Sequence, residues 1–327
     1  MDKKIKVIVV TGPTATGKTR LTVELARYFD GEIISADSRQ VYRGMDIGTG
    51  KDLAEYSEGG SPVPCHLINI IEPTESYNLK SFCQDAKDAV FDISERGRLP
   101  LFAGGTTMYI NALFSGYTLP GGPPDSDLRD SLANKSIDEL ADILRKSSPE
   151  SFEDLKDKEH RNRLIRAIEK SRVSSSQVEP LAPFVEPLFI GVFYKREEVR
   201  ARIAQRLSQR LASGMIEEVE CLHRNGVSWE KLEYFGLEYR YIAFYLQKKM
   251  SYDEMKEKLL IRIRKFAKSQ DVWFRKMERE GRVIHWVEKG SFDKARAIVQ
   301  TFLDGELLPE PEIMLKNIHY GPQSSKP

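Results

Sequence analysis

The stretch Gly12-Pro13-Thr14-Ala15-Thr16-Gly17-Lys18-Thr19 decides the fold of this chain. It follows the apolar run Ile5 to Val10, which predicts a strand, and precedes the helical pattern Leu21 to Phe29. A GxxxxGKT sequence in this setting is typical of a P-loop, whose backbone N–H groups and helix N-terminus converge on a phosphate. We expect Lys18 to reach the outer phosphate oxygens and the Thr19 hydroxyl to ligate Mg²⁺. The loop alone leaves open whose phosphates it binds.

Composition limits the classes of protein that need be considered. The chain has 327 residues, room for two domains, and its net charge is only +1, so a basic surface has to come from clustering. The three cysteines, Cys65, Cys83 and Cys221, lie far apart, which argues against a disulfide framework and a structural zinc site. The N-terminal apolar run is too short for a signal peptide or a membrane span. We therefore expect a cytoplasmic protein without a membrane partner.

Apolar runs, turns and helical patterns alternate along the first third of the chain. Strands are expected at residues 32–36, 63–71 and 99–103, and helices at 79–95 and 108–114. A second glycine turn, Gly104-Gly105-Thr106-Thr107, precedes the last of these helices. The strand signal resumes at 188–194, and 282–287 is expected to be an edge strand. This order predicts an α/β fold: a P-loop NTPase-like, doubly wound parallel sheet.

Asp37 directly follows the second expected strand. Ligands of open α/β sheets bind outside the carboxyl ends of the strands, so Asp37 faces the P-loop if its strand neighbours the first one. Its carboxylate then contacts Mg²⁺ or acts as a general base; the alternative is an aspartate that caps a turn. His66 is interpreted as a core or turn histidine, since only Cys65 lies near it as a possible metal ligand.

The strand–turn–helix alternation stops at Tyr117. Residues 118–125 and 174–187 have linker composition, and helical patterns cover 126–132, 136–146 and 157–172 between them. We expect a helical insertion domain at 118–186 on a discontinuous core made of 1–117 and 187–304. Residues 305–327 are expected to form a flexible tail.

Basic residues cluster at three places in the sequence. These clusters indicate either solvated helix faces or a binding surface for a polyanion such as nucleic acid. The third cluster is interleaved with the aromatic residues Phe266, Trp273 and Phe274. The three clusters are Lys158, Arg161, Arg163, Arg166, Lys170 and Arg172; Arg196, Arg200, Arg202, Arg206 and Arg210; and Arg262, Arg264, Lys265, Lys268, Arg275 and Lys276.

Seven segments together resemble the tRNA dimethylallyltransferases, over about Lys6 to Trp286. In order they are GPTATGKT, SADSRQVYRGMDIGTGK, HLINIIEPTESY, GGTTMYINAL, NRLIRAIE, RARIAQRLSQRLASGMIEEV and RKFAKSQDVWFRK. The resemblance implies transfer of a dimethylallyl group from dimethylallyl diphosphate to the exocyclic N6 amine of the adenosine just 3′ of the anticodon. The P-loop, residues 12–19, then binds a diphosphate rather than ATP.

The same resemblance implies roles for individual residues. Asp37 is the general base, Arg206 joins Lys18 and the Mg²⁺ held by Thr19 in stabilising the leaving diphosphate, and the target adenine is extruded from the anticodon loop. We expect a monomer whose partners are dimethylallyl diphosphate and the anticodon stem-loop of tRNA. The residues implied in tRNA binding are Asp37, Ser38, Arg39, Gln40, Thr106, Asn162, Arg163, Leu164, Ile165 and Arg166.

This sequence departs from the family pattern in three places. The insertion is short, Asp157 to His160 replace the usual HPND, and Cys65-His66 and Asn69 stand where paired histidines and an aspartate are common. Two further hypotheses are a prenyltransferase acting on free adenosine nucleotides and an RNA-binding NTP switch. The hinged insertion and the basic, aromatic third cluster favour tRNA over a mononucleotide. The switch hypothesis lacks an evident second acidic strand end of the Walker-B type.

Overall fold

The computed structural model describes residues 4–115, 118–119, 125–155, 157–172, 176–177 and 180–318. The chain divides into two compact units, one formed by Met1–Ile110 with Ala182–Pro327 and the other by Asn111–Leu181. The second unit thus begins and ends before the predicted insertion limits of 118 and 186. Its start falls inside a helix, α3 (Thr107–Ser115), rather than in the linker after it.

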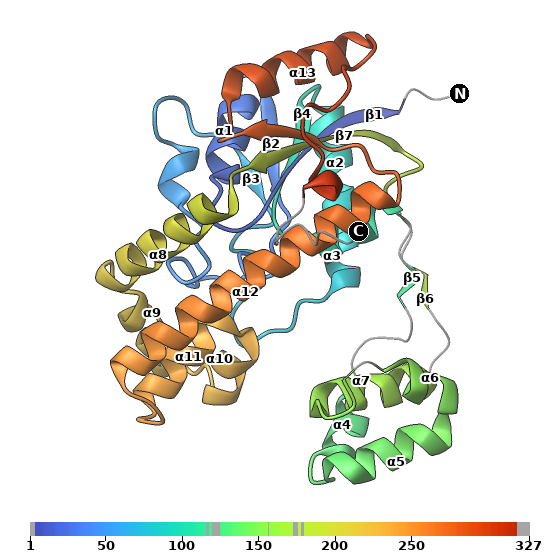
Figure 1. Cartoon of the computed structure of the whole chain (residues 1–327), viewed down its shortest axis with the longest axis vertical. Helices are drawn as coiled ribbons and strands as arrows, with labels where there is room; N and C mark the ends of the chain where they lie inside the picture. Colours follow the sequence, from blue (N-terminus) through green and yellow to red (C-terminus); the bar gives the residue numbers. More distant parts are fainter. Residues whose placement is uncertain are drawn as a thin grey trace, which may run out of the picture. The chain divides into compact units, whose positions relative to one another are not determined.

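A six-stranded sheet forms the centre of the first unit, with the order β3-β2-β4-β1-β7-β8 (Figure 1). All five neighbouring pairs are parallel, which confirms the predicted doubly wound α/β sheet. β1 lies inside the sheet, and its side chains from Val7 to Val10 are fully buried. The strands are β1 (Ile5–Thr11), β2 (Gly31–Ser35), β3 (Cys65–His66), β4 (Leu99–Ala103), β7 (Val185–Phe193) and β8 (His285–Glu288).

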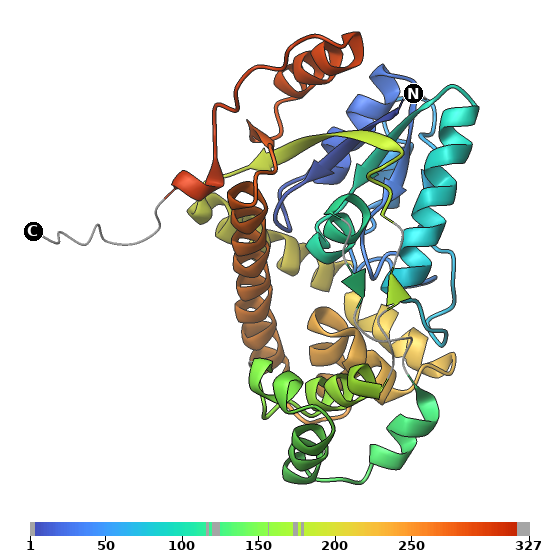
Figure 2. The same ribbon diagram turned by 90° about the vertical axis from the view of Figure 1, so that its right-hand side faces the viewer.

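Helices cover both faces of this sheet. α1 (Lys18–Tyr28) and α13 (Phe292–Asp304) share one hydrophobic core with alternate residues of the strands, such as Ile8 and Val10. α2 (Leu79–Glu95) packs on β2 and β4, and Figure 2 shows it on the other face. Successive side chains of each strand therefore pack on opposite faces of the sheet, as expected for a sheet that is buried on both sides.

A helical layer follows β7 and forms its own core. The predicted stripe on α8 (Arg196–Ala212) is present: Val199, Ile203 and Leu207 are buried in this layer. Val41, Tyr42 and Met45, from the segment after Asp37, pack into the same core. This packing fixes the segment after Asp37 to α8 and its neighbours. The other helices of the layer are α9 (Met215–Arg224), α10 (Trp229–Phe235), α11 (Leu237–Leu246) and α12 (Tyr252–Arg279).

The strand predicted at 63–71 is wrong over most of its length, because β3 contains only Cys65 and His66. Leu67 and Asn69 have φ angles of 60° and 55°, in a region that a strand does not use. Residues 69–71 instead form backbone hydrogen bonds with residues 40–43, among which only Tyr42 and Ile71 form a β-bridge. A 3₁₀ helix, η1 (Leu53–Tyr56), precedes β3.

The prediction of a flexible tail from residue 305 needs correction for 315–318, the part that packs on α12. Leu315, in the 3₁₀ helix η2 (Leu315–Asn317), is buried. Its amide and that of Lys316 donate to the buried Glu278 carboxylate at 3.1 and 2.6 Å, and this carboxylate also accepts from Trp286 Nε1. Hydrogen bonds thus fix this segment to α12. Residues 319–327 of the predicted tail lie outside the described residues.

The second unit is helical and has its own hydrophobic core, which includes Leu140, Leu144, Leu164 and Ile168. Two short strands, β5 (Thr118–Leu119) and β6 (Ser176–Gln177), pair antiparallel in the segments predicted as linkers. Residues 120–124, 174–175 and 178–179 of those linkers lie outside the described residues. The helices are α4 (Ser126–Leu132), α5 (Ile137–Ser147), α6 (Pro149–Asp154), which the sequence analysis did not predict, and α7 (Arg161–Arg172).

Candidate active site

A crevice in the first unit lies at the P-loop. It brings together residues from the P-loop, the end of β2, the turn after β4, α8 and α12. The lining residues include Thr14, Ala15, Gly17, Lys18, Thr19, Asp37, Gln40, Asp52, Glu55, Gly104, Gly105, Arg206, Phe266 and Gln270. We call this set of residues the crevice.

Lys18 is the first residue of α1, directly after the loop. Its Nζ donates a hydrogen bond to the Pro13 carbonyl at 2.8 Å, so the side chain folds back over the P-loop. Burial and the charge of Arg206 lower the pKa of Lys18 from 10.5 to about 8. An anion in the crevice would oppose both effects and favour the protonated ammonium group.

Arg206 reaches the crevice from α8. Its Nη2 lies 3.4 Å from Oγ1 of Thr14 in the P-loop. Burial, and secondly the charge of Arg210, lower the pKa of Arg206 to about 10. Two cationic side chains from different elements, Lys18 and Arg206, therefore meet at the loop, as binding of a phosphate group requires.

Asp37 lies in the crevice although its strand does not neighbour β1. β4 is inserted between β2 and β1, so the condition attached to the prediction is not met. Gly104, directly after β4, packs closely against the end of β2: a Cβ on Gly104 would lie 2.3 Å from the Ala36 carbonyl oxygen. The absence of that Cβ lets the chain end of β2 approach the turn after β4.

The Asp37 carboxylate also shapes its own turn. Its Oδ1 accepts from the backbone N–H of Arg39 at 2.8 Å. Asp37 therefore also caps a turn, as the alternative interpretation from sequence proposed. The next amide, of Ser38, donates to Thr106 Oγ1 at 3.3 Å. The structure thus brings Asp37, Ser38 and Thr106 together at one edge of the sheet.

The two other candidates that follow Ser38 have partners within the protein. Gln40 accepts from Ser35 Oγ at 2.9 Å and donates to the Gly50 carbonyl at 3.1 Å, while still lining the crevice. Arg39 Nε donates to the Phe235 carbonyl at 2.9 Å, and its guanidinium lies over the exposed Tyr234 ring. Arg39 therefore ties the turn to α10.

Gln270 is a crevice residue that the sequence analysis missed. Its Oε1 accepts from the Thr14 backbone N–H at 2.8 Å, and its Nε2 donates to the Gly105 carbonyl at 2.7 Å. The side chain is buried and joins α12 to both glycine turns. In the sequence, Gln270 is a single amide side chain within the basic, aromatic third cluster, and that pattern indicates only positive charge.

A magnesium ion fits the donor set of the crevice. Thr19 and the carboxylates of Asp52 and Glu55 line it together. Glu55 Oε2 is buried and has no hydrogen-bond partner among the described residues. Burial and the charge of Asp52 raise the pKa of Glu55 to about 7. The described residues contain no group of three His, Cys, Asp or Glu that could hold a metal alone, so the ion needs further oxygens from a phosphate ligand and water.

His66 is a structural residue, which confirms its interpretation from sequence. Its Nε2 lies 2.7 Å from Oε2 of Glu32, a β2 carboxylate whose side chain is 3% exposed. Arg96 and Arg98 approach the same carboxylate. The hydrogen bond from Arg96 and that from His66 lower the pKa of Glu32 to about 2 despite its burial.

The remaining predicted residues lie on α7 of the second unit. Asn162 and Arg163 are exposed, and Arg166 pairs with Glu169 at 2.9 Å. Leu164 and Ile165 are buried in the core of the unit. These two side chains hold α7 in place, so a contact of either residue with RNA would have to come from its backbone, and their assignment to tRNA binding stays a prediction.

The other two basic clusters occupy different settings. Arg202 on α8 is exposed, but its Nε donates to the Ala15 carbonyl of the P-loop at 2.7 Å. On α12, Arg262, Arg264, Lys265 and Lys268 are exposed. Phe266 and Trp273 are partly exposed beside them, whereas Phe274 is fully buried. None of the helices in the described part of the chain has both the length and the apolar character that a bilayer-spanning segment requires.

Comparison with known proteins agrees with these features. The family model described as IPP transferase matches residues 40–277, and that described as isopentenyl transferase matches residues 5–61. The chain is 47% identical to tRNA dimethylallyltransferase 1 of Syntrophus aciditrophicus over 88% of this chain and 94% of the relative. It is 49% identical to tRNA dimethylallyltransferase 1 of Geotalea uraniireducens over 86% of this chain and 92% of that relative.

A solved structure gives the same result. The crystal structure of the full-length tRNA isopentenylpyrophosphate transferase from Bacillus halodurans superposes with a TM-score of 0.66 at 33% identity. The match covers 92% of this chain and 96% of that one. A P-loop crevice that contains Asp37 from the end of β2, two family models and near-full-length relatives lead to one conclusion: the chain belongs to the tRNA dimethylallyltransferase (IPP transferase) family.

Proposed function

We propose that the protein transfers the dimethylallyl group of dimethylallyl diphosphate to the N6 amine of the adenosine immediately 3′ of the anticodon in tRNA. The observation that carries this proposal is that one crevice contains a P-loop with Lys18, a carboxylate at Asp37 and an arginine at Arg206. The family membership supplies the substrate class.

Asp37 is the residue that we assign to the acceptor. In the reaction a bond forms between N6 and the allylic carbon, and the amine must lose one proton to a positioned base. The Asp37 carboxylate lies at the strand end that faces the P-loop and has one oxygen engaged by the Arg39 amide. That hydrogen bond orients the carboxylate, which takes up the proton.

Lys18 and Arg206 are assigned to the leaving group. The allylic carbon–oxygen bond breaks as negative charge develops on diphosphate, and preorganised cations in a buried site stabilise such charge strongly. Both side chains are in the crevice before substrate binds, and each has its pKa lowered by burial. Thr19 would hold a Mg²⁺ ion, which supplies further neutralisation of the diphosphate.

Recognition of tRNA is assigned to residues outside the diphosphate site. Ser38, Gln40 and Thr106 surround Asp37 and suit contact with an extruded adenine and its neighbours. Asn162, Arg163 and Arg166 on α7 are assigned to the anticodon stem-loop. The three cysteines are free, which supports action in a reducing compartment such as the cytoplasm.

A transfer assay with labelled dimethylallyl diphosphate tests the proposal. The purified chain is incubated with unmodified tRNA or with AMP, and incorporation of label is measured. Label is expected in tRNA, at the adenosine 3′ of the anticodon. Label in AMP alone would instead support the prenyltransferase of free nucleotides, and hydrolysis of ATP without prenyl transfer would support the NTP switch.

A further inference from the structure

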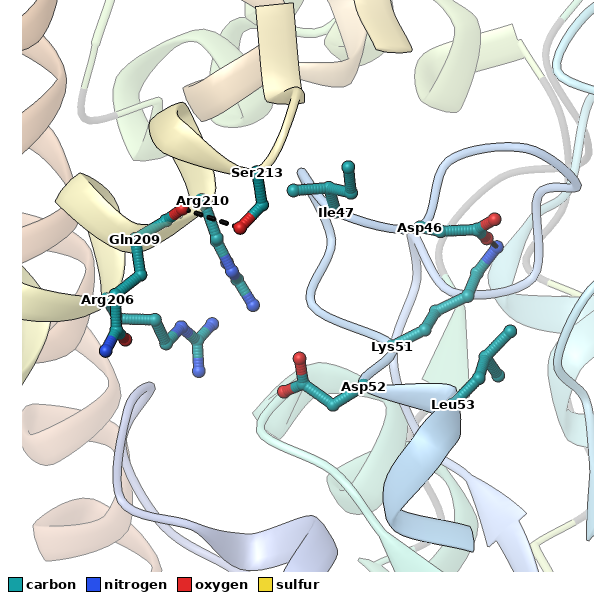
Figure 3. Close-up of a pocket in the computed structure, with 9 residues that line it drawn as sticks. All are labelled: Asp46, Ile47, Lys51, Asp52, Leu53, Arg206, Gln209, Arg210 and Ser213. Carbon is teal, nitrogen blue, oxygen red and sulfur yellow. Dashed lines mark hydrogen bonds and ion pairs between the residues drawn. The ribbon is translucent and has the colours of Figure 1, made fainter. Parts of the chain in front are cut away.

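A second pocket of about 350 Å³ adjoins the crevice in the first unit (Figure 3). Asp52 and Arg206 line both cavities, so the two share a wall. We call it the arginine pocket. Its lining residues are Asp46, Ile47, Lys51, Asp52, Leu53, Arg206, Gln209, Arg210 and Ser213.

Arg210 is the unexplained residue of this pocket. It lies one turn after Arg206 on α8, and its side chain is only 9% exposed. Nη2 is fully buried and has no hydrogen-bond partner among the described residues, while Nη1 lies 4.0 Å from Oε1 of Glu238. A buried guanidinium with an unused donor is costly, because the donor has lost water without gaining another acceptor.

The two arginines converge on one point of the backbone. A Cβ on Gly50, whose φ is +65°, would lie 1.4 Å from Nη2 of Arg210 and 3.2 Å from Nη2 of Arg206. Figure 3 shows both guanidinium groups on one side of the pocket, opposite Asp52. The absence of a side chain at Gly50 thus lets two like charges approach each other.

The other charges of the pocket do not neutralise this pair. Asp46 is engaged by the fully buried Lys51, whose Nζ lies 2.6 Å from Oδ1 of Asp46 and also donates to the Tyr42 carbonyl. Within the described residues, no ion pair of 4.0 Å or less joins Asp52 to either arginine. Among the lining residues, Lys51, Arg206 and Arg210 are cationic and only Asp46 and Asp52 are acidic, so positive charge exceeds negative charge in the lining. Glu238, 4.0 Å from Arg210, does not line this pocket.

A phosphate group is the ligand that suits this arrangement. Its oxygens can each accept from the planar fork of an arginine, and its charge offsets the repulsion between two guanidinium groups. The P-loop occupies the adjoining cavity, so an anion with two linked phosphate groups could contact both. Resting on the proposed function, we propose that Arg210 is a second arginine of the diphosphate site, which together with Arg206 binds one phosphate group in the arginine pocket while the P-loop binds the other.

Binding of inorganic diphosphate to the full chain, measured by isothermal titration calorimetry with Mg²⁺ present, tests this proposal. Arg210→Gln is expected to weaken diphosphate binding by about 10-fold to 100-fold. Arg210→Lys keeps the charge but loses the planar, two-pronged guanidinium group. Its affinity for diphosphate is expected to lie between that of Arg210→Gln and that of the wild type. Arg224→Gln, which removes an exposed arginine of α9, is the charge-matched control and should bind diphosphate normally.

Inorganic phosphate provides the second arm of the experiment. Arg210→Gln should bind inorganic phosphate almost as the wild type does, because the P-loop still binds a single phosphate group. An equal loss for both anions, or a diphosphate affinity within twofold of the wild type, would overturn the assignment.

Thermal unfolding separates binding from folding. A merely structural role opposite Glu238 predicts a lower Tm for Arg210→Gln with unchanged diphosphate affinity, which would also refute the proposal. Our proposal predicts a reduced diphosphate-induced rise in Tm. Wild-type transfer to tRNA, measured in parallel, tells failure of this assignment apart from failure of the proposed function.

Discussion

The helices α7 and α8 carry similar patterns of arginines, yet Arg163 of α7 and Arg206 of α8 lie in opposite environments. On α8, Arg202 and Arg206 turn toward the P-loop, and Arg206 is buried enough for its pKa to fall to about 10. On α7, Arg163 is 57% exposed and pairs at 3.2 Å with Asp157. Under the proposed function, the same residue type binds a small anion from one helix and a large, solvated polyanion from the other. The expected effects of mutation differ accordingly.

The largest effect is expected at Asp37, the acceptor side of the crevice. Asp37→Ala should reduce turnover by about 10²- to 10⁴-fold, because the proton of the amine loses its acceptor. Binding of tRNA, measured by filter binding, should remain largely intact. Asp37→Asn is the matched control, since its side-chain oxygen can still accept from the Arg39 amide. An Asn variant that retains near-normal turnover would remove the base assignment.

Arg206→Gln tests the buried side of the comparison. Turnover at saturating tRNA should fall by about 10²- to 10³-fold, because a preorganised donor to the leaving group is lost. Steady-state kinetics with varied dimethylallyl diphosphate measure this effect, and affinity for tRNA should not change. A variant that is impaired only in tRNA binding would place Arg206 with the exposed arginines instead.

Arg163→Ala tests the exposed side. The loss of one phosphate contact should weaken tRNA binding by a few fold and reduce the slope of log affinity against log salt by about 0.7 to 0.9. Arg145→Ala is the matched control, because Arg145 is also 57% exposed and also pairs with an acid of the same unit, Asp142. If both variants show the wild-type slope, α7 has an ordinary solvated face.

The Glu32 cluster is a third setting, in which charges are satisfied within the protein. Its carboxylate faces His66, Arg96 and Arg98, so Glu32→Gln should lower the free energy of unfolding at pH 7 by about 2 kcal/mol and leave diphosphate binding unchanged. The folded-state pKa of about 2 lies below the ordinary value of 4.5. The stabilisation is therefore fully present above about pH 4.5 and is lost as the pH falls toward 2.

Denaturant unfolding of the wild type and of Glu32→Gln between pH 7 and pH 3 measures this dependence. The difference between the two proteins should shrink as the pH falls through this range. A difference that stays constant with pH would mean that the substitution acts through packing rather than through the ionised carboxylate.

Prediction from sequence succeeded where structure is local. The P-loop joins contiguous elements, β1 and α1, and both were found within a few residues of their observed bounds. α2 was predicted with its observed ends from its helical apolar period and the glycine that follows it, Gly97, which has a φ of 73°. The structure adds that the Asn78 side chain caps its start. Prediction from sequence failed at 63–71, because this apolar segment contains two residues with positive φ, Leu67 and Asn69, that the composition does not indicate.

The candidate site shows the same division. Lys18 and Thr19 follow from a motif, but Gln270 was missed because its two hydrogen-bond partners, the Thr14 N–H and the Gly105 carbonyl, lie more than 160 residues away in sequence. Leu164 and Ile165 belong to a contiguous motif that was assigned to RNA contact, and the helix directs their side chains into the hydrophobic core of the second unit. A motif identifies a segment, and only packing decides which of its faces is accessible.

The sequence by itself determined the phosphate-binding turn, because its strand, loop and helix follow one another directly in the chain. The bond from the Thr14 amide to Gln270 is a tertiary addition to that local turn. Only the tertiary structure decided that Asp37 would meet that turn across an intervening β4, through the close approach at Gly104. It likewise decided that Arg206 and Arg210 point into cavities while Arg163 points to solvent. The physical reason is that local propensity sets the periodicity of a helix, whereas the elements packed against it determine which face is buried.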